Sequence, residues 1–167
     1  MIEHYNLALN VLDDYDHQCM KKPKGAGCTY VLSYEECRSL INQMKFAAES
    51  DLFGNEKDDS FKGSIGAIYQ TFGGMEVYPT LEEKAANLLY FLTKNHSFSD
   101  GNKRIAATLF IYFLDRNNAL IIGGIKRIDD YALAALTIMI AESKPEEKEI
   151  MVKVVMNCLV DGMDKCA

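Results

Sequence analysis

The chain reads LEEKAANLLYFLTKN from Leu81 to Asn95, HSFSDG from His96 to Gly101 and NKRIAATLFIYFLDRN from Asn102 to Asn117. The first piece has apolar residues on nearly every side of a helix, which is typical of a central, buried helix. Thr80 and Glu83 have the spacing of a capping box at its start. The third piece has an apolar face made by Ile105, Leu109, Tyr112 and Phe113. The sequence therefore predicts two core helices joined by a polar loop.

Further helices are predicted on both sides of this pair. Their approximate ranges are Glu3 to Tyr15, Ser33 to Ala48, Phe61 to Gln70, Asp129 or Asp130 to Glu142, and a last helix that starts at Ser143. Ser33 with Glu36, and Ser143 with Glu146, have capping-box spacing, and Pro145 suits a first helical turn.

One β element is expected, in the stretch Phe72-Gly73-Gly74-Met75-Glu76-Val77-Tyr78-Pro79. The paired glycines suit a tight hairpin turn, and the residues after them can pair as a short strand. The predicted fold class is all-α, a helical bundle with one short β-hairpin. The length of 167 residues suits a single domain over 1–167, with a core at about 60–120. The abrupt start near Glu3 permits the chain to be one domain of a longer protein.

Composition excludes several classes of protein. The net charge of -6 argues against a duplex-DNA partner, which requires a clustered basic surface. No apolar run reaches the length that crosses a bilayer, so no membrane partner is expected. Cysteines stand at Cys19, Cys28, Cys37, Cys158 and Cys166, an odd number without zinc spacing. His4 and His17 do not complete such a site and are expected to face solvent. Reduced thiols and a cytoplasmic location are the expectation.

The loop between the two core helices has the composition of a binding site. A loop that enters the core between such helices is expected to be short and bland unless it has a function. Gly101 and Asn102 fall where the second helix begins, where free backbone N–H groups and the helix dipole favour an anion. Lys103 and Arg104 add cationic groups in the same turn, where positive charge normally disfavours a helix. A bound phosphate would account for this combination.

Two further residues of the loop suit catalysis. Asp100 offers a hard oxygen that can hold Mg²⁺ beside a phosphate. His96 can remove a proton from a hydroxyl near neutral pH, and Phe98 is expected to anchor the loop in the core. The alternative is ordinary capping by Asp100 and Asn102, with His96 as a helix C-terminal partner. A second basic loop, from Lys21 to Gly27, is expected to be a solvated linker, with a phosphate site as the alternative.

The string HSFSDGNKR resembles the signature of the Fic/Doc family: His, x, Phe, x, Asp or Glu, Gly, Asn, Gly or Lys, Arg. Six defining positions match. The wider stretch from Tyr69 to Leu114 is similar to Fic domains of RhuM-type bacterial proteins, and the resemblance extends over about residues 5–160. It implies a transferase that moves part of ATP, with Mg²⁺, to a Ser, Thr or Tyr hydroxyl of a target protein.

The resemblance also implies a role for each motif residue. His96 would be the base, Asp100 the metal ligand, Gly101 and Asn102 the anion hole, and Arg104 the group that stabilises phosphate charge. The hairpin would be a flap that docks the target by strand pairing. The residues of this flap would be Gly73, Gly74, Met75, Glu76, Val77 and Tyr78.

Two positions distinguish subtypes of the family. Lys103 stands where adenylyl-transferring members usually have Gly, and Ala107 where they usually carry a second Arg. Doc-type members resemble this chain at both points, and in them the γ-phosphate faces the nucleophile. Phosphoryl transfer is therefore favoured slightly over adenylyl transfer (AMPylation). A catalytically silent module that binds nucleotide or a partner is a further alternative.

Control of the site is expected either within the chain or from a partner. Many Fic proteins carry a Ser/Thr-x-x-x-Glu-Gly/Asn helix whose Glu blocks the γ-phosphate position. The stretch Ser143 to Glu147 fits the spacing, but Lys148 follows, and a plain helix start accounts for it. An inhibitory partner like the antitoxin of Doc, in a toxin–antitoxin pair, is the alternative.

Overall fold

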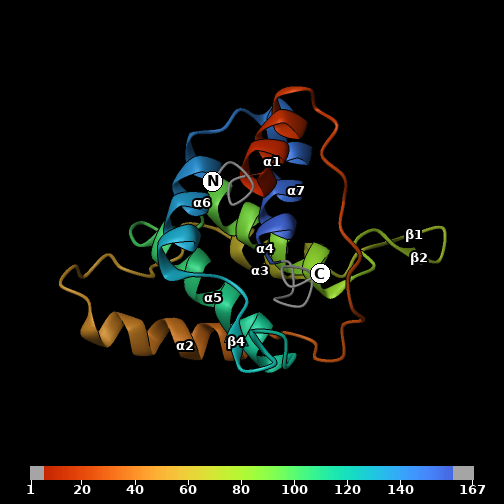
Figure 1. The fold of residues 1–167 in the computed structure, drawn as a ribbon. Helices are drawn as coiled ribbons and strands as arrows, with labels where there is room; N and C mark the ends of the chain where they lie inside the picture. Colours follow the sequence, from red (N-terminus) through yellow and green to blue (C-terminus); the bar gives the residue numbers. More distant parts are fainter. Residues whose placement is uncertain (1–5, 160–167) are drawn as a thin grey trace.

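The computed structural model describes residues 6–159, and within them the chain is mostly helical (Figure 1). The helices are α1 (Asn6–Asp16), α2 (Tyr34–Ala47), α3 (Ser60–Ala67), α4 (Leu81–Lys94), α5 (Asn102–Arg116), α6 (Asp130–Glu142), the 3₁₀ turn η2 (Pro145–Glu147) and α7 (Lys148–Cys158). The strands are β1 (Thr71–Phe72), β2 (Met75–Glu76), β3 (Ile121–Ile122) and β4 (Ile125–Lys126). The all-α fold class is confirmed. The predicted helix start at Glu3, His4 and Cys166 lie outside the described residues.

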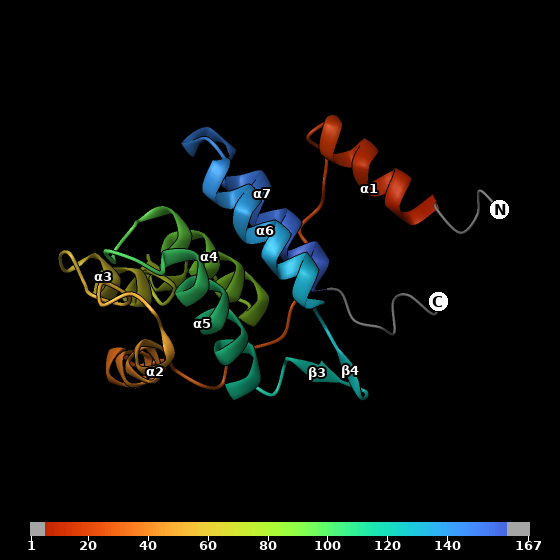
Figure 2. The same ribbon diagram turned by 90° about the vertical axis from the view of Figure 1, so that its left-hand side faces the viewer.

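Helix α4 lies at the centre of the core. It packs against α3, α5, α6 and α7, and Figure 2 shows α6 and α7 side by side above α4 and α5. Leu88, Leu89 and Leu92 of α4 are almost completely buried. The prediction of a central, buried helix is confirmed. None of the described helices is long and apolar enough to cross a membrane.

The described residues contain two β-hairpins where the sequence predicted one. The predicted hairpin pairs β1 with β2 around Gly73 and Gly74, which both have positive φ. The second pairs β3 with β4 around Gly123 and Gly124, also with positive φ. The expectation of a single β element is therefore wrong. Glycine pairs at positive φ close tight hairpins even when each strand has only two residues.

The helix starts follow the predicted capping except at two places. The box of Ser33 and Glu36 is complete. At Thr80 only half of the box forms, because the Glu83 carboxylate contacts Lys22 instead of returning to the Thr80 backbone.

The predicted box of Ser143 and Glu146 is wrong by one residue. Ser143 ends α6, and its hydroxyl donates to the Ile140 carbonyl at 2.6 Å. The backbone N–H of Lys144 donates to Glu147 Oε1 at 2.7 Å. Pro145 occupies the first position of η2, so the cap is the residue before it.

A half-buried carboxylate ties α2 to α5. Glu36 accepts hydrogen bonds from the Tyr30 hydroxyl, from the Tyr112 hydroxyl at 2.9 Å and from the Ser33 N–H at 2.7 Å. Burial alone would raise the pKa of Glu36, but these hydrogen bonds outweigh it and the pKa is lowered. Burial and the Glu36 contact raise the pKa of Tyr112 to about 12. The ionised form of Glu36 therefore contributes to the stability of the fold.

The substitution Glu36→Gln is expected to lower the free energy of unfolding at neutral pH by about 1.5–3 kcal/mol, the range for hydrogen bonds to a charged group. Because the folded-state pKa of Glu36 is lowered, this contribution is present above the unfolded-state pKa. It is lost as the pH falls through the folded-state value. Urea unfolding of both proteins from neutral to acid pH should show the difference shrinking in acid. The exposed neighbour Glu35→Gln is the control, and an equal effect of both substitutions would contradict the prediction.

Candidate active site

The motif loop leaves α4 at Asn95 and enters α5 at Asn102. Ser97 and Phe98 in the middle of the loop are buried. The Phe98 ring packs on Phe61 of α3 with 4.8 Å between ring centroids. The structure thus places Phe98 in the core, where it fixes the middle of the loop.

A segment that the sequence analysis treated only as a break in the pattern lies beside the loop. The Gly54 N–H donates to the Asp100 carbonyl at 3.0 Å, and the Ser99 N–H donates to the Asn55 carbonyl at 2.8 Å. The Lys57 N–H donates to the Ser97 carbonyl at 2.8 Å. Residues 53–57 therefore form a short ladder along the motif loop. The sequence contains only a weak signal for this ladder, an aromatic residue and a glycine, Phe53 and Gly54, within a polar run. In the structure Phe53 is buried.

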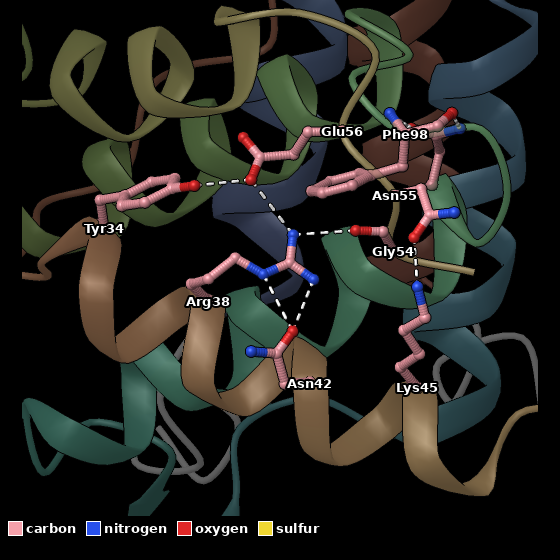
Figure 3. A network of polar contacts seen from close by, with 9 residues as sticks. Tyr34, Arg38, Asn42, Lys45, Gly54, Asn55, Glu56 and Phe98 are labelled. Atoms are coloured by element: carbon pink, nitrogen blue, oxygen red, sulfur yellow. Dashed lines mark hydrogen bonds and ion pairs between the residues drawn. The ribbon is translucent and has the colours of Figure 1, made fainter. Parts of the chain in front are cut away.

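Side chains of α2 hold this segment in place (Figure 3). Arg38 Nη1 donates to the Gly54 carbonyl at 2.8 Å and contacts Glu56 Oε2 at 3.2 Å. The Tyr34 hydroxyl donates to the same Glu56 oxygen at 2.6 Å, and this hydrogen bond raises the pKa of Tyr34. Helix α2 thus supports the segment, and the segment supports the motif loop.

The Asn102 side chain closes the loop on itself. Its Oδ1 accepts from the Phe98 N–H at 3.0 Å, and its Nδ2 donates to the Phe98 carbonyl at 2.8 Å. Both ends of the amide are therefore used inside the loop. The contribution of Asn102 to an anion site has to come from its backbone N–H, while its side chain sets the shape of the loop.

Gly101 is the N-cap of α5 and has φ +90°. A Cβ atom there would lie 2.3 Å from the Phe53 ring. Both the backbone conformation and the contact with Phe53 exclude a side chain. Because the cap residue has no side chain, no side-chain cap covers the first N–H groups of α5, and these remain suited to an anion.

The motif residues surround one shallow cavity of about 380 Å³. It is lined by His96, Ser99, Asp100, Gly101, Asn102, Lys103 and Arg104. Lys103 and Arg104 are exposed, so the opening at the start of α5 is cationic. The structure therefore brings together the predicted base, metal ligand and phosphate-binding residues in one place.

Asp100 and Arg104 face each other across the first turn of α5. Their side chains form an ion pair at 3.4 Å, and the guanidinium lies 4.7 Å from the centroid of the Phe53 ring. In the described part of the chain, no three His, Cys, Asp or Glu side chains group around a metal position. A single carboxylate fits Mg²⁺ that a nucleotide brings with it, because such Mg²⁺ keeps phosphate and water ligands.

His96 lies on the rim of the cavity just after α4. It is exposed and has a positive φ of 47°, a conformation uncommon outside glycine. The hydrogen bonds described above hold the loop after it. This backbone bend directs the chain from the end of α4 into the motif loop.

The predicted docking hairpin lies far from this cavity. Lys84, in the first turn of α4, donates to Glu76 Oε1 at 2.9 Å and to the Tyr78 carbonyl at 2.5 Å. The motif begins after the last turn of α4, and a helix of this length spans about 20 Å. Figure 1 shows the hairpin projecting on the opposite side from the motif loop. The structure does not bring residues Gly73, Gly74, Met75, Glu76, Val77 and Tyr78 to the motif.

The stretch from Ser143 to Glu147, considered above as an inhibitory helix, also lies away from the motif cavity. Glu146 and Glu147 line a cavity together with the end of α1 and with α7. Neither of them lines the motif cavity.

The substitution Gly101→Ala is expected to destabilise the protein more than Gly74→Ala. Both glycines have positive φ, which costs an alanine about 1–2 kcal/mol. Only at Gly101 does the new Cβ meet another group, the Phe53 ring, whereas Gly74 has open space around it. Free energies of unfolding from urea titration measure the difference. Equal losses in the two variants would mean that the Phe53 contact does not constrain this position.

The comparison with known families agrees with this geometry. Residues 32–114 match the model of the Fic/DOC family. No curated protein and no solved structure matches the chain. The RhuM-type subfamily therefore has no support beyond the resemblance of the motif region. The matched residues include α2, which supports segment 53–57, as well as the motif loop and α4. The match supports a Fic/Doc family domain over residues 32–114.

Proposed function

We propose that the protein is a Mg²⁺-dependent transferase that moves a phosphoryl group from ATP to a Ser, Thr or Tyr hydroxyl of a target protein. The observation that carries the proposal is the start of α5. Its N–H groups have no side-chain cap, and Lys103 and Arg104 lie beside them around the motif cavity. Membership of the Fic/Doc family suggests a transferase of nucleotidyl or phosphoryl groups, and the motif residues of this chain are intact.

His96 is the proposed base. It stands on the rim of the cavity, where a target hydroxyl can approach from solvent. The hydroxyl oxygen forms a bond to the γ-phosphorus as the bond from that phosphorus to the bridging oxygen of ADP breaks. The hydroxyl proton passes to the imidazole of His96. Arg104 and the N–H groups of α5 stabilise the phosphate charge that builds up during transfer.

Asp100 is the proposed ligand of Mg²⁺. Bound with the nucleotide, Mg²⁺ neutralises phosphate charge. The ion pair with Arg104 at 3.4 Å keeps the Asp100 carboxylate at the same end of α5.

Lys103 is the residue that favours phosphoryl over adenylyl transfer. It lines the cavity in the first turn of α5, where a glycine would leave room for another phosphate. The Lys103 ammonium group favours a phosphate that lies beside it. The aliphatic part of the same side chain occupies the space that a glycine would leave for another phosphate. Adenylyl transfer remains the alternative, with the α-phosphorus attacked and pyrophosphate as the leaving group.

In this proposal, segment 53–57 is better placed than the β1–β2 hairpin to position a target. The segment runs directly along the motif loop, whereas the hairpin is held at the other end of α4. A target that docks beside segment 53–57 would present its hydroxyl close to His96. Control of the site by a separate antitoxin-like partner also suits an exposed motif.

Parallel incubations with ATP labelled at the α- or γ-phosphate test the reaction. With bacterial lysate as the source of targets, we expect label from the γ-position only. The substitution His96→Ala should lower the transfer rate by about a hundredfold or more, the range for a general base, while nucleotide binding persists. The substitution Lys103→Gly should increase transfer from the α-position.

The matched control is His17→Ala, because His17 is also exposed and its ring pairs with Asp13 near the end of α1, away from the motif. It should leave the transfer rate unchanged. Label from the α-position in the unaltered protein would overturn the phosphoryl proposal in favour of AMPylation. Nucleotide binding without transfer of either label would favour a silent binding module.

A further inference from the structure

His96, the proposed base, lies between two residues whose side chains are held by the same helix. On one side, Asn95 Nδ2 donates to Ser64 Oγ at 2.7 Å. On the other side, the hydroxyl groups of Ser97 and Ser60 form a hydrogen bond at 2.7 Å. Ser60 and Ser64 are four residues apart and therefore lie on one face of α3. Both neighbours of the base are thus tied to α3, a helix to which the transfer reaction proposed above assigns no role.

The side chains in these contacts form one connected set. The Ser64 hydroxyl donates to the Ser60 carbonyl at 3.0 Å, which directs its proton there and leaves its oxygen to accept from Asn95. Ser64 is 2 % exposed, and Ser97 is completely buried. A buried hydroxyl that loses its partner is left unsatisfied at a cost, so neither serine can exchange its partner for bulk water.

Helix α3 is itself fixed in the core. Phe61 and Ile65, which follow the two serines in the chain, are buried. The Phe61 ring packs on Phe98 of the motif loop and on Tyr34 of α2, with ring centroids 4.8 and 5.6 Å apart. The helix also packs against α4, which ends at the motif loop. A rigid element therefore carries the two serines, as a positioning role requires.

The backbone of His96 needs such support. Its φ of 47° lies in the left-handed region, which is unfavourable for a residue with a side chain and persists where surrounding contacts enforce it. His96 is exposed, so packing of its own side chain in the core does not enforce this conformation. The contacts of the residues on either side of it remain as the constraint.

We propose that Ser60 and Ser64 are positioning residues for His96. Their hydrogen bonds to the two flanking residues keep the His96 backbone in the left-handed conformation, and this orients the imidazole at the rim of the motif cavity. A general base acts within hydrogen-bond reach of the proton that it removes, and a displacement of about 1 Å can cost about a hundredfold in rate. The effect on the rate rests on the proposed function, whereas the effect on the conformation does not.

The effect on conformation is measured by NMR, without any reaction. The order parameter of the His96 backbone amide is expected to be about 0.85 in the unaltered protein, the value of a rigid backbone. It should fall below about 0.6 in Ser64→Ala and in Asn95→Ala. An order parameter that stays at the rigid value in either folded variant overturns the proposal. Asn95 is exposed, so Asn95→Ala tests the same hydrogen bond even if Ser64→Ala does not fold.

The matched control is Thr137→Val. Like Ser64, Thr137 is a buried helical residue whose hydroxyl donates to the carbonyl four residues earlier, in this case that of Leu133 in α6. Its loss should leave the order parameter of His96 unchanged. An equal loss of order in the control would overturn the proposal, because any buried hydroxyl would then have the same effect.

The effect on the rate is measured with labelled ATP. Ser64→Ala and Asn95→Ala should each lower kcat by about tenfold to a hundredfold with little change in the KM for ATP, because the phosphate-binding residues of α5 are unaltered. The double variant should be no slower than either single variant, since both changes remove one hydrogen bond.

A purely structural role would lower the fraction of folded protein and leave kcat per folded molecule unchanged. That result overturns the positioning role, as do losses that multiply in the double variant. If the unaltered protein transfers no label, the proposed function fails, and the order parameter of His96 still decides whether the two serines hold its backbone.

Discussion

Twelve of the fourteen residues of α4 are buried, and the position of every functional element depends on this helix. A helix buried on all sides has to be covered by neighbours, and α3, α5, α6 and α7 supply that cover. Removing a fully buried leucine such as Leu88 from a core of this kind costs about 2–5 kcal/mol. The two ends of α4 are therefore held about 20 Å apart as fixed points. One end presents the motif loop, and the other holds the β1–β2 hairpin.

The burial of α4 includes its charged first turn, which requires specific partners. Glu82 contacts Arg127 at 3.2 Å, and both side chains are about 6 % exposed. Lys84, which is almost completely buried, binds Glu76 and the Tyr78 carbonyl. Buried charges are tolerated when they are paired and hydrogen-bonded, and breaking such a pair destabilises a protein strongly. The first turn of α4 thus orders the hairpin, while Glu83 beside it keeps one oxygen without a hydrogen-bond partner among residues 6–159.

The sequence predicted those parts of the structure that depend on local patterns. The core helices, the complete capping box at Ser33 and the hairpin at Gly73 follow from periodicity and turn chemistry within a few residues. The motif string also predicted which residues meet around one cavity, because they are neighbours along the chain. The support of the loop by residues 53–57 and Arg38 could not be predicted, because it depends on contacts between distant segments. The family resemblance implied that the hairpin docks a target at the motif, but α4 separates the hairpin from the motif in space.

Segment 53–57 has a consequence for where the domain can be cut. A fragment limited to the central residues from about 60 to 120 would keep every residue of the motif string, both core helices and the hairpin. It would lose the backbone partners of Ser97, Ser99 and Asp100, the Phe53 ring against Gly101, and the α2 side chains that hold them. The fragment would then contain the motif residues without the contacts that hold the loop in its conformation. The smallest unit that preserves the loop has to begin before α2.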